Sequence, residues 1–268
     1  MERYTRVFSF MFEVFGMAGK NPTLFRPILF NVMLAAPFNI GLAVVYGHIH
    51  SQMAGYAVML AGVAVLYFID YFCAGLTASL IYDQVTTGNA TMSAALERTK
   101  KAAPSIMIFA AISALFDFLA SIAQERNDIV GKIVSQIVYL VWTTATYVVM
   151  PTMVIEGLHF TEAFSRAKAL GKNDPTNVGS GIIGIGLVNY IVSGACMFVA
   201  YQGSHALAHI SPIVGAVFFF TFFNVSWALT GFLKTSYFTC FYLWAKECEK
   251  KGSASTSFAP APLAAALS

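Results

Sequence analysis

Charged residues are scarce in this sequence, and their scarcity excludes an ordinary soluble domain. Only 11% of the 268 residues are charged, against about 25% in a typical soluble protein. Hydrophobic residues make up 57% of the chain, and the mean hydropathy is +0.68. Polar side chains cannot cover so apolar a chain in water, so we expect the lipid bilayer to cover it. The small net charge of +3 gives no reason to expect a nucleic-acid partner.

Motifs that would indicate metal or catalytic chemistry are also missing. The four cysteines lie far apart and form no C-x-x-C pair, so zinc and thioredoxin-type sites have no support. No nucleophile, base and orienting group occur together at a recognisable spacing, and zinc-peptidase and P-loop motifs are absent. We therefore expect neither an enzyme nor a bound cofactor.

Six apolar stretches are long enough to cross a bilayer, whose core of about 30 Å needs roughly 20 helical residues. They cover residues 24–46, 56–82, 104–124, 131–155, 178–201 and 212–244. The sequence thus predicts an all-α integral membrane protein, with about six spanning helices in one polytopic domain over 21–251. Residues 1–20 alternate polar and apolar faces at helical spacing, which is typical of an amphipathic interfacial helix. Residues 252–268 are rich in Ala, Ser and Pro, so we expect a flexible tail with a short apolar docking segment near 258–267.

Basic residues gather on one side of the predicted spans. Thirteen of the sixteen Lys and Arg residues lie before or at the start of the first span, between the second and third, between the fourth and fifth, or after the sixth. The positive-inside rule places this side in the cytoplasm. We therefore expect a multipass protein of the cytoplasmic membrane, with both termini in the cytoplasm.

Two of the basic loops resemble each other. Residues 93–100 and 161–168 both read hydroxyl, any residue, Ala, large apolar, any residue, Arg, small, Lys. Each fits a short cytoplasmic helix with a Ser or Thr cap. We predict a parallel internal repeat of residues 56–124 and 131–201, with chance similarity of two amphipathic loops as the alternative. The basic side chains of these loop helices are Arg98, Lys100, Lys101, Arg166 and Lys168.

Several motifs connect the chain with a known group of proteins. They are Asn21 to Pro27 at the first span, Glu125-Arg126 and residues 131–134 before the fourth span, Trp142, Pro151, Glu156-Gly157, residues 163–166 and residues 258–260. On these motifs the chain resembles an uncharacterised family of prokaryotic multipass membrane proteins, catalogued as a domain of unknown function. Ala167 and residues 172–174 depart from that pattern, in which a Ser and a nearby Trp are expected.

A second, looser resemblance comes from the order of proline, acid, glycine and amphipathic loop helix. This order is similar to the membrane domain that accompanies some glycerophosphodiester phosphodiesterases. Together the resemblances imply the inner membrane of a prokaryote as the location, and they imply no established activity.

Ionisable side chains inside predicted spans are the main candidates for a functional site, because a charge within the bilayer is costly. Asp70 lies near the middle of the second span, where it could bind a proton or a cation in a polar crevice. Alternatively, it forms a hydrogen bond with a neighbouring Tyr or Asn and fixes helix packing. Asp117 lies in the outer half of the third span, where we expect a structural role. Glu156 follows the fourth span and could cap the loop helix or pair with Arg98 or Arg166.

Small and polar residues in the spans predict contacts between helices. Ser180 and Gly184 form a small-xxx-small step that favours close helix packing. Four amides are candidates for hydrogen bonds between spans: Asn39, Gln136, Asn189 and Asn224.

Four histidines map to the outer side: His48, His50, His205 and His209. The last two are four residues apart and would share one face of a helix. Imidazoles on one face can bind a transition metal, although short polar loops often contain histidines without one.

These observations favour a membrane-embedded binding or assembly protein. It would engage membrane-protein partners, further copies of the chain or lipids at its basic cytoplasmic face. The alternative is a small transporter or channel, with Asp70 as an intramembrane proton or cation site. Transport would require a hydrated path past Asp70, whereas assembly would place the function in the loop helices and the tail.

Overall fold

The structure is a computed structural model that describes residues 2–125, 148–173, 175–253 and 255–267. Of residues 2–7, 121–125, 171–173, 175–184, 256 and 265–267 it describes only the backbone. The described ranges contain helices and no strand, so the predicted all-α fold class is confirmed for them.

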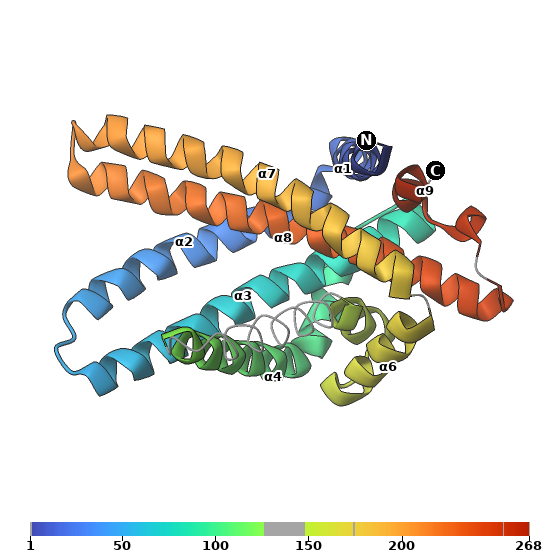
Figure 1. Cartoon of the computed structure of the whole chain (residues 1–268), viewed down its shortest axis with the longest axis horizontal. Coiled ribbons are helices and arrows are strands. Elements are labelled where there is room, and N and C mark those ends of the chain that lie inside the picture. Colours follow the sequence, from blue (N-terminus) through green and yellow to red (C-terminus); the bar gives the residue numbers. More distant parts are fainter. Residues whose placement is uncertain (1, 126–147, 174, 254, 268) are drawn as a thin grey trace.

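The helices follow one another with short connections (Figure 1). They are α1 (Glu2–Lys20), η1 (Pro22–Phe25), α2 (Arg26–Gly47), α3 (Gln52–Thr87), α4 (Met92–Glu125), a helix of residues 148–156, α6 (Phe160–Asn173), α7 (Pro175–Ala208), α8 (Pro212–Lys251), η2 (Thr256–Phe258) and α9 (Ala261–Leu267). Local sequence explains several ends. The Ser51 hydroxyl accepts the N–H of Ala54 at the start of α3, and α8 begins with Pro212. Gly88 and Gly252, with φ of 72° and 66°, end α3 and α8 in the left-handed conformation that glycine favours.

Five of the described helical segments are long and apolar enough to cross a membrane. They are Pro22–Gly47, Gln52–Thr87, Met92–Ala120, Ile185–Ala208 and Pro212–Lys251. Large apolar side chains point outward from them, among them Met33, Met53, Phe198 and Ile213. Such faces suit lipid, and the five segments match five of the six predicted spans. The remaining prediction, residues 131–155, lies mostly outside the described residues.

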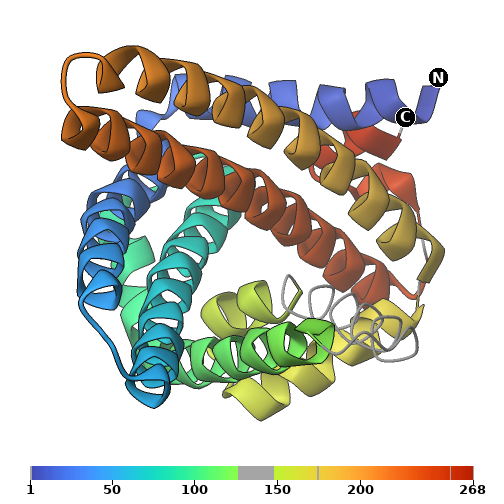
Figure 2. The ribbon, with the colours of Figure 1, turned by 60° about the vertical axis from the view of Figure 1, so that its left-hand side comes forward.

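Two helical hairpins, α2–α3 and α7–α8, pack together at one end and diverge at the other (Figures 1 and 2). α8 contacts both α2 and α3, and α4 packs along α3. Residues 75–81 of α3 and 235–242 of α8 are buried without interruption, so other helices surround these segments on all sides. The buried core therefore lies at the end of the molecule that also holds both termini.

The two termini meet at this end, because α1 packs against α9. Phe10, Val14 and Ala18 recur every four residues on α1 and are fully buried, whereas Glu13 and Lys20 on the other face are exposed. The predicted amphipathic helix therefore buries its apolar stripe against the protein itself.

The tail is more ordered than the sequence indicates. Where we expect a flexible tail, η2 and α9 fold back, and Leu263 is buried among the core residues. The Trp244 indole donates a hydrogen bond to the carbonyl of Ser255 at 2.8 Å, which holds the connection to α8. The apolar segment near 258–267 has a partner surface in α1, and this contact accounts for the difference.

The two similar motifs have similar local structure. α4 begins at Met92 and α6 at Phe160, the residue before each motif. Equivalent positions match in burial: Ala95 with Ala163 and Thr99 with Ala167 are buried, and Lys100 with Lys168 are exposed. The first motif, however, is not a separate loop helix. It forms the first turns of α4, which continues through Pro104, whereas α6 is a helix of its own and Pro175 begins the next one.

Candidate functional site

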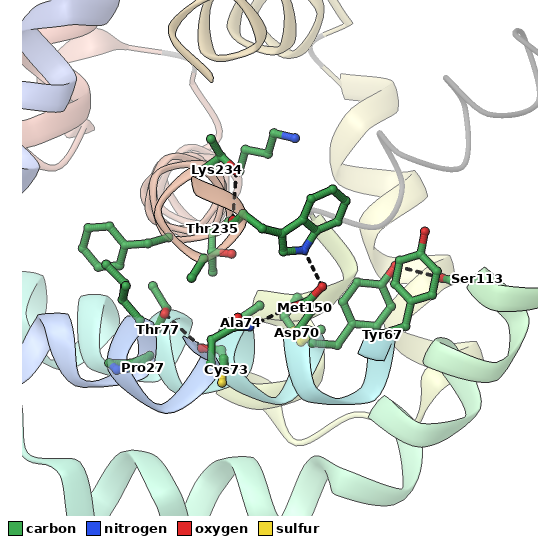
Figure 3. A pocket seen from close by; sticks show the side chains of 18 of the residues that line it. Pro27, Tyr67, Asp70, Cys73, Ala74, Thr77, Ser113, Met150, Lys234 and Thr235 are labelled. Carbon is green, nitrogen blue, oxygen red and sulfur yellow. Dashed lines mark hydrogen bonds between the residues drawn. The ribbon is translucent and has the colours of Figure 1, made fainter. Parts of the chain in front are cut away.

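A cavity of about 160 Å³ lies between α2, α3, α4 and α8, on the inner side of the diverging hairpins (Figure 3). Its polar lining comes from four candidate spans and includes Asn31, Tyr67, Asp70, Asp117, Trp227 and Lys234. A polar cavity between apolar helices is unusual, since each polar group there needs a partner. The cavity is therefore the best-supported candidate for a functional site.

Asp70 lies on the face of α3 that is turned toward α2 and α8. Its Oδ1 accepts a hydrogen bond from the Asn31 amide at 2.6 Å, and its Oδ2 accepts one from the Trp227 indole N–H. The carboxylate is thus held by donors from two other helices. Asparagine is one of the two neighbour types that the sequence led us to expect beside Asp70. The cavity also fits the other interpretation, in which Asp70 binds a proton or a cation in a polar crevice.

Asn31 leaves one acceptor unused. Its side chain is only 4% exposed, and among the described residues its Oδ1 has no hydrogen-bond partner. An unpaired buried acceptor costs about 1–3 kcal/mol. A donor from a ligand, a water molecule or a cation next to Asp70 would remove this cost.

Asp117 lines the same cavity as Asp70, although the sequence indicated a separate structural role. The Tyr67 hydroxyl, one turn before Asp70 on α3, donates to the Asp117 carboxylate. Tyr71, the next turn along, donates to the Ser113 hydroxyl at 2.9 Å. This row of contacts holds α4 against α3 and brings the two carboxylates to one cavity.

Sequence reasoning missed three residues of this site. Asn31 is an amide within an apolar run, and that pattern could have indicated it. Trp227 carried no such signal, because a tryptophan is common in spans. Lys234 lies within the predicted span 212–244, so its charge could have indicated it by the same rule as Asp70. Only the packing of α8 against α2 and α3 brings them to Asp70.

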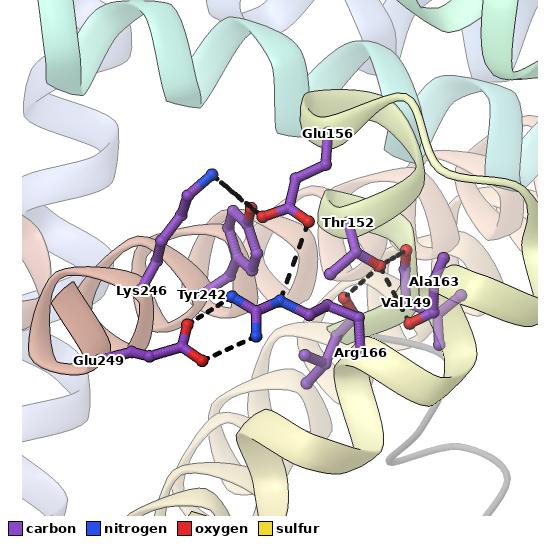
Figure 4. A network of polar contacts seen from close by, with 9 residues as sticks. Val149, Thr152, Glu156, Ala163, Arg166, Tyr242, Lys246 and Glu249 are labelled. Carbon is purple, nitrogen blue, oxygen red and sulfur yellow. Dashed lines mark hydrogen bonds and ion pairs between the residues drawn. The ribbon is translucent and has the colours of Figure 1, made fainter.

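A second polar cluster joins the helix of residues 148–156, α6 and α8 (Figure 4). Glu156 receives the Lys246 ammonium at 3.0 Å, the Arg166 guanidinium at 3.9 Å and a hydrogen bond from the Tyr242 hydroxyl. Arg166 also binds Glu249 through two nitrogens, one of them at 2.9 Å. We call these five residues the Glu156 cluster, and their contacts indicate a structural role.

The charges of the Glu156 cluster support one another. Burial raises the pKa of Glu156, but the hydrogen bonds from Tyr242 and Lys246 and the nearby positive charges outweigh burial and lower it overall. The hydrogen bond to Glu249 raises the pKa of Arg166 above its ordinary value. Both side chains therefore stay ionised at neutral pH.

Arg98, the other predicted partner of Glu156, instead binds α3. Its guanidinium donates to Asp83 at 2.7 Å and to the Ser79 hydroxyl at 3.1 Å. Each motif arginine thus pairs with an acid of the helix that precedes it.

The remaining predicted residues are distributed as follows. Lys101 pairs with Glu97 at 2.8 Å on the exposed face of α4, and Lys100 and Lys168 are exposed. Asn39 and Asn224 form the expected bond between spans at 2.9 Å. Gln136 lies outside the described residues, and Ser180 and Gly184 lie where only the α7 backbone is described.

The four histidines that we predict on the outer side do not gather into one group in the described structure. His205 and His209 have ring centroids 5.2 Å apart, whereas the ring nitrogens of His48 and His50 lie against backbone carbonyls of Val44 and His48. In the part of the chain that the structure describes, no group of three or more His, Cys, Asp or Glu side chains could hold a metal ion.

Comparison with known proteins gives one match. A model described as a family of unknown function (DUF6159) matches residues 53–252, which is most of the chain. No curated protein matches. The expected resemblance to an uncharacterised family is confirmed, whereas the similarity to phosphodiesterase-associated domains and the prokaryotic origin stay predictions.

Proposed function

From the premise that this chain belongs to the DUF6159 family of unknown function, we propose that it is a small membrane transporter with a proton or cation site at Asp70. The observation that carries the proposal is the cavity in which Asp70 and Asp117 meet from two different spans. Ionisable groups inside spans commonly mark ion or proton pathways.

The composition of the cavity supports a positively charged ligand. Asp70 and Asp117 contribute two carboxylates, and Asn31 adds an amide oxygen without a partner among the described residues. Lys234 supplies one positive charge to the same lining. The two carboxylates thus outnumber the one positive side chain of the lining. A proton or a small cation at Asp70 would bring the net charge of the site close to zero.

The assembly interpretation is the second candidate. Arg98 and Arg166 are engaged in contacts within the protein, which leaves them less available to partners. One observation still favours it, namely that Lys100 and Lys168 are exposed at equivalent positions of the two motifs. Exposed lysines of this kind can attract anionic lipid headgroups or acidic protein surfaces.

The proposal includes a complete topology. The contact between α1 and α9 supports both termini lying on one side of the membrane, and that arrangement requires an even number of crossings. Five described segments leave one crossing to be supplied, which supports six spans in all. We place both termini in the cytoplasm of a prokaryotic inner membrane, and the matching burial of the two motifs supports a parallel repeat.

Proton flux into vesicles tests the function. Purified protein is reconstituted into liposomes that contain a pH-sensitive dye, and a potassium diffusion potential is applied. We expect wild-type vesicles to take up protons faster than empty ones, and Asp70→Asn to abolish this difference. Asparagine keeps the volume of the side chain and its acceptor oxygen but cannot carry the proton.

The matched control is the double variant Lys100→Glu and Lys168→Glu, which reverses exposed charge outside the cavity lining. It should leave the flux unchanged at equal reconstitution. Normal flux in Asp70→Asn, or loss of flux only in the lysine double variant, would favour assembly over transport.

A further inference from the structure

A second cavity, of about 390 Å³, lies between α7 and α8. It shares Trp227, Thr230 and Lys234 of α8 with the Asp70 cavity, so these three side chains separate the two spaces. The remaining lining comes from one face of α7 and the preceding turns of α8. Neither the transport proposal nor the sequence motifs assign a role to this cavity.

The buried amide of Asn189 marks the polar end of this cavity. Asn189 is 6% exposed, and within the described parts of the chain neither its amide nitrogen nor its oxygen has a hydrogen-bond partner. Leaving such groups unpaired costs about 1–3 kcal/mol each. A ligand that carries both an acceptor and a donor would satisfy both atoms.

The surrounding side chains define the chemistry of that ligand. Lys234 contributes a positive charge, and Ser226 donates to the Ser193 hydroxyl at 3.2 Å, beside Asn189 on the same lining. This end suits an anionic oxygen together with a hydroxyl group. Met197 and Phe223 form an apolar wall that suits a hydrocarbon chain.

The position along the helices fits a lipid-like molecule. At 1.5 Å per residue, Lys234 lies about 33 Å along α8 from Pro212, and Asn189 lies about 29 Å along α7 from Ala208. Both therefore lie close to the far boundary of a bilayer core of about 30 Å. Tyr190 and Trp227, which line the cavity, are 82% and 51% exposed. The cavity is therefore open at these residues, and a ligand could enter there sideways from the membrane.

We propose that the α7–α8 cavity binds an anionic amphiphile. An anionic headgroup oxygen would lie at Lys234 and accept from the Asn189 amide N–H, a headgroup hydroxyl would donate to the Asn189 oxygen, and the acyl chain would lie along Met197 and Phe223. In the proposed orientation, with both termini in the cytoplasm, the site would draw its ligand from the inner leaflet. This proposal does not depend on proton transport at Asp70, because Asn189, on which it rests, lines the α7–α8 cavity and not the Asp70 cavity.

Quenching of Trp227 fluorescence tests the site in the full-length protein in phosphatidylcholine nanodiscs. The probes are stearic acid, phosphatidylglycerol and phosphatidylcholine, each brominated on the acyl chain. The Trp227 signal is the difference between the protein and its Trp227→Phe variant. We expect saturable quenching by the two anionic probes and only weak quenching by phosphatidylcholine. Phosphatidylglycerol carries headgroup hydroxyls and should quench at a lower concentration than stearic acid, which offers only anionic oxygens. Tighter binding of stearic acid would contradict the role assigned to the Asn189 oxygen.

Asn189→Leu should raise the half-saturating concentration of the anionic probes by about tenfold or more, as expected for one lost hydrogen bond to a charged group. Gln202→Leu, an exposed amide on the same helix, is the matched control and should bind normally. If Asn189→Leu does not fold, Lys234→Gln is measured in its place. Equal quenching by all three probes, or unchanged binding in the cavity variants, would overturn the proposal.

Discussion

Replacing Glu156 by glutamine should destabilise the protein, because this side chain connects three helical segments. Its side chain is 18% exposed and contacts Tyr242, Lys246 and Arg166. Glutamine keeps one acceptor oxygen but loses the charge, so two cations at the cluster lose their shared partner. From typical values for hydrogen bonds to charged groups, we expect a loss of roughly 2 kcal/mol in the free energy of unfolding.

The matched control is Glu97→Gln. Glu97 also pairs with a lysine, Lys101 at 2.8 Å, but both side chains are largely exposed to solvent. Exposed pairs of this kind contribute little, so the variant should unfold like the wild type. Unfolding is followed by helical circular dichroism in detergent over increasing urea. Equal losses in the two variants would show that the Glu156 cluster does not hold the helices together.

The Glu156→Gln variant also tests how the stability contributed by Glu156 depends on pH. The folded-state pKa of Glu156 lies below its ordinary value, so its stabilisation is present above the unfolded pKa of about 4.3. It is lost as the pH falls through the still lower folded-state pKa. The difference in stability between wild type and Glu156→Gln should therefore be constant near neutral pH and shrink toward zero in acid. A difference that grows in acid would contradict the assignment.

Three further predictions concern packing and topology. A Cβ at Gly75 would lie 2.9 Å from the Thr99 Cγ2, so Gly75→Ala should lower stability by about 1–3 kcal/mol, measured by the same unfolding assay. Leu263→Asp puts a charge into the contact between α1 and α9, so limited proteolysis should cut the tail much faster than in wild type or in Leu263→Met. Reporter fusions at Ser268 should be active in the cytoplasm and those at Ser51 outside, and the reverse pattern would refute the orientation.

The sequence by itself determined the helical fold class and most of the candidate spans. Helix hydrogen bonds are local, and the bilayer requires about 20 apolar residues per crossing, so both features can be read along the chain. The predicted span 24–46 accordingly falls within η1 and α2, and the predicted span 56–82 falls within α3. The apolar stripe of residues 1–20 was also visible, because it follows the helical period.

The tertiary structure decided which side chains meet. Asp70 and Asp117 are far apart in sequence, and only the packing of α4 along α3 brings them to one cavity. An apolar stripe on a helix predicts that this face is buried, but it does not say which surface covers it. The sequence therefore could not show that α9 packs on α1. The partner that a charged side chain chooses also depends on which helices pack together. Glu156 could have paired with Arg98 or Arg166, and the approach of α6 and α8 selects Arg166, since Arg98 is held by Asp83 on α3.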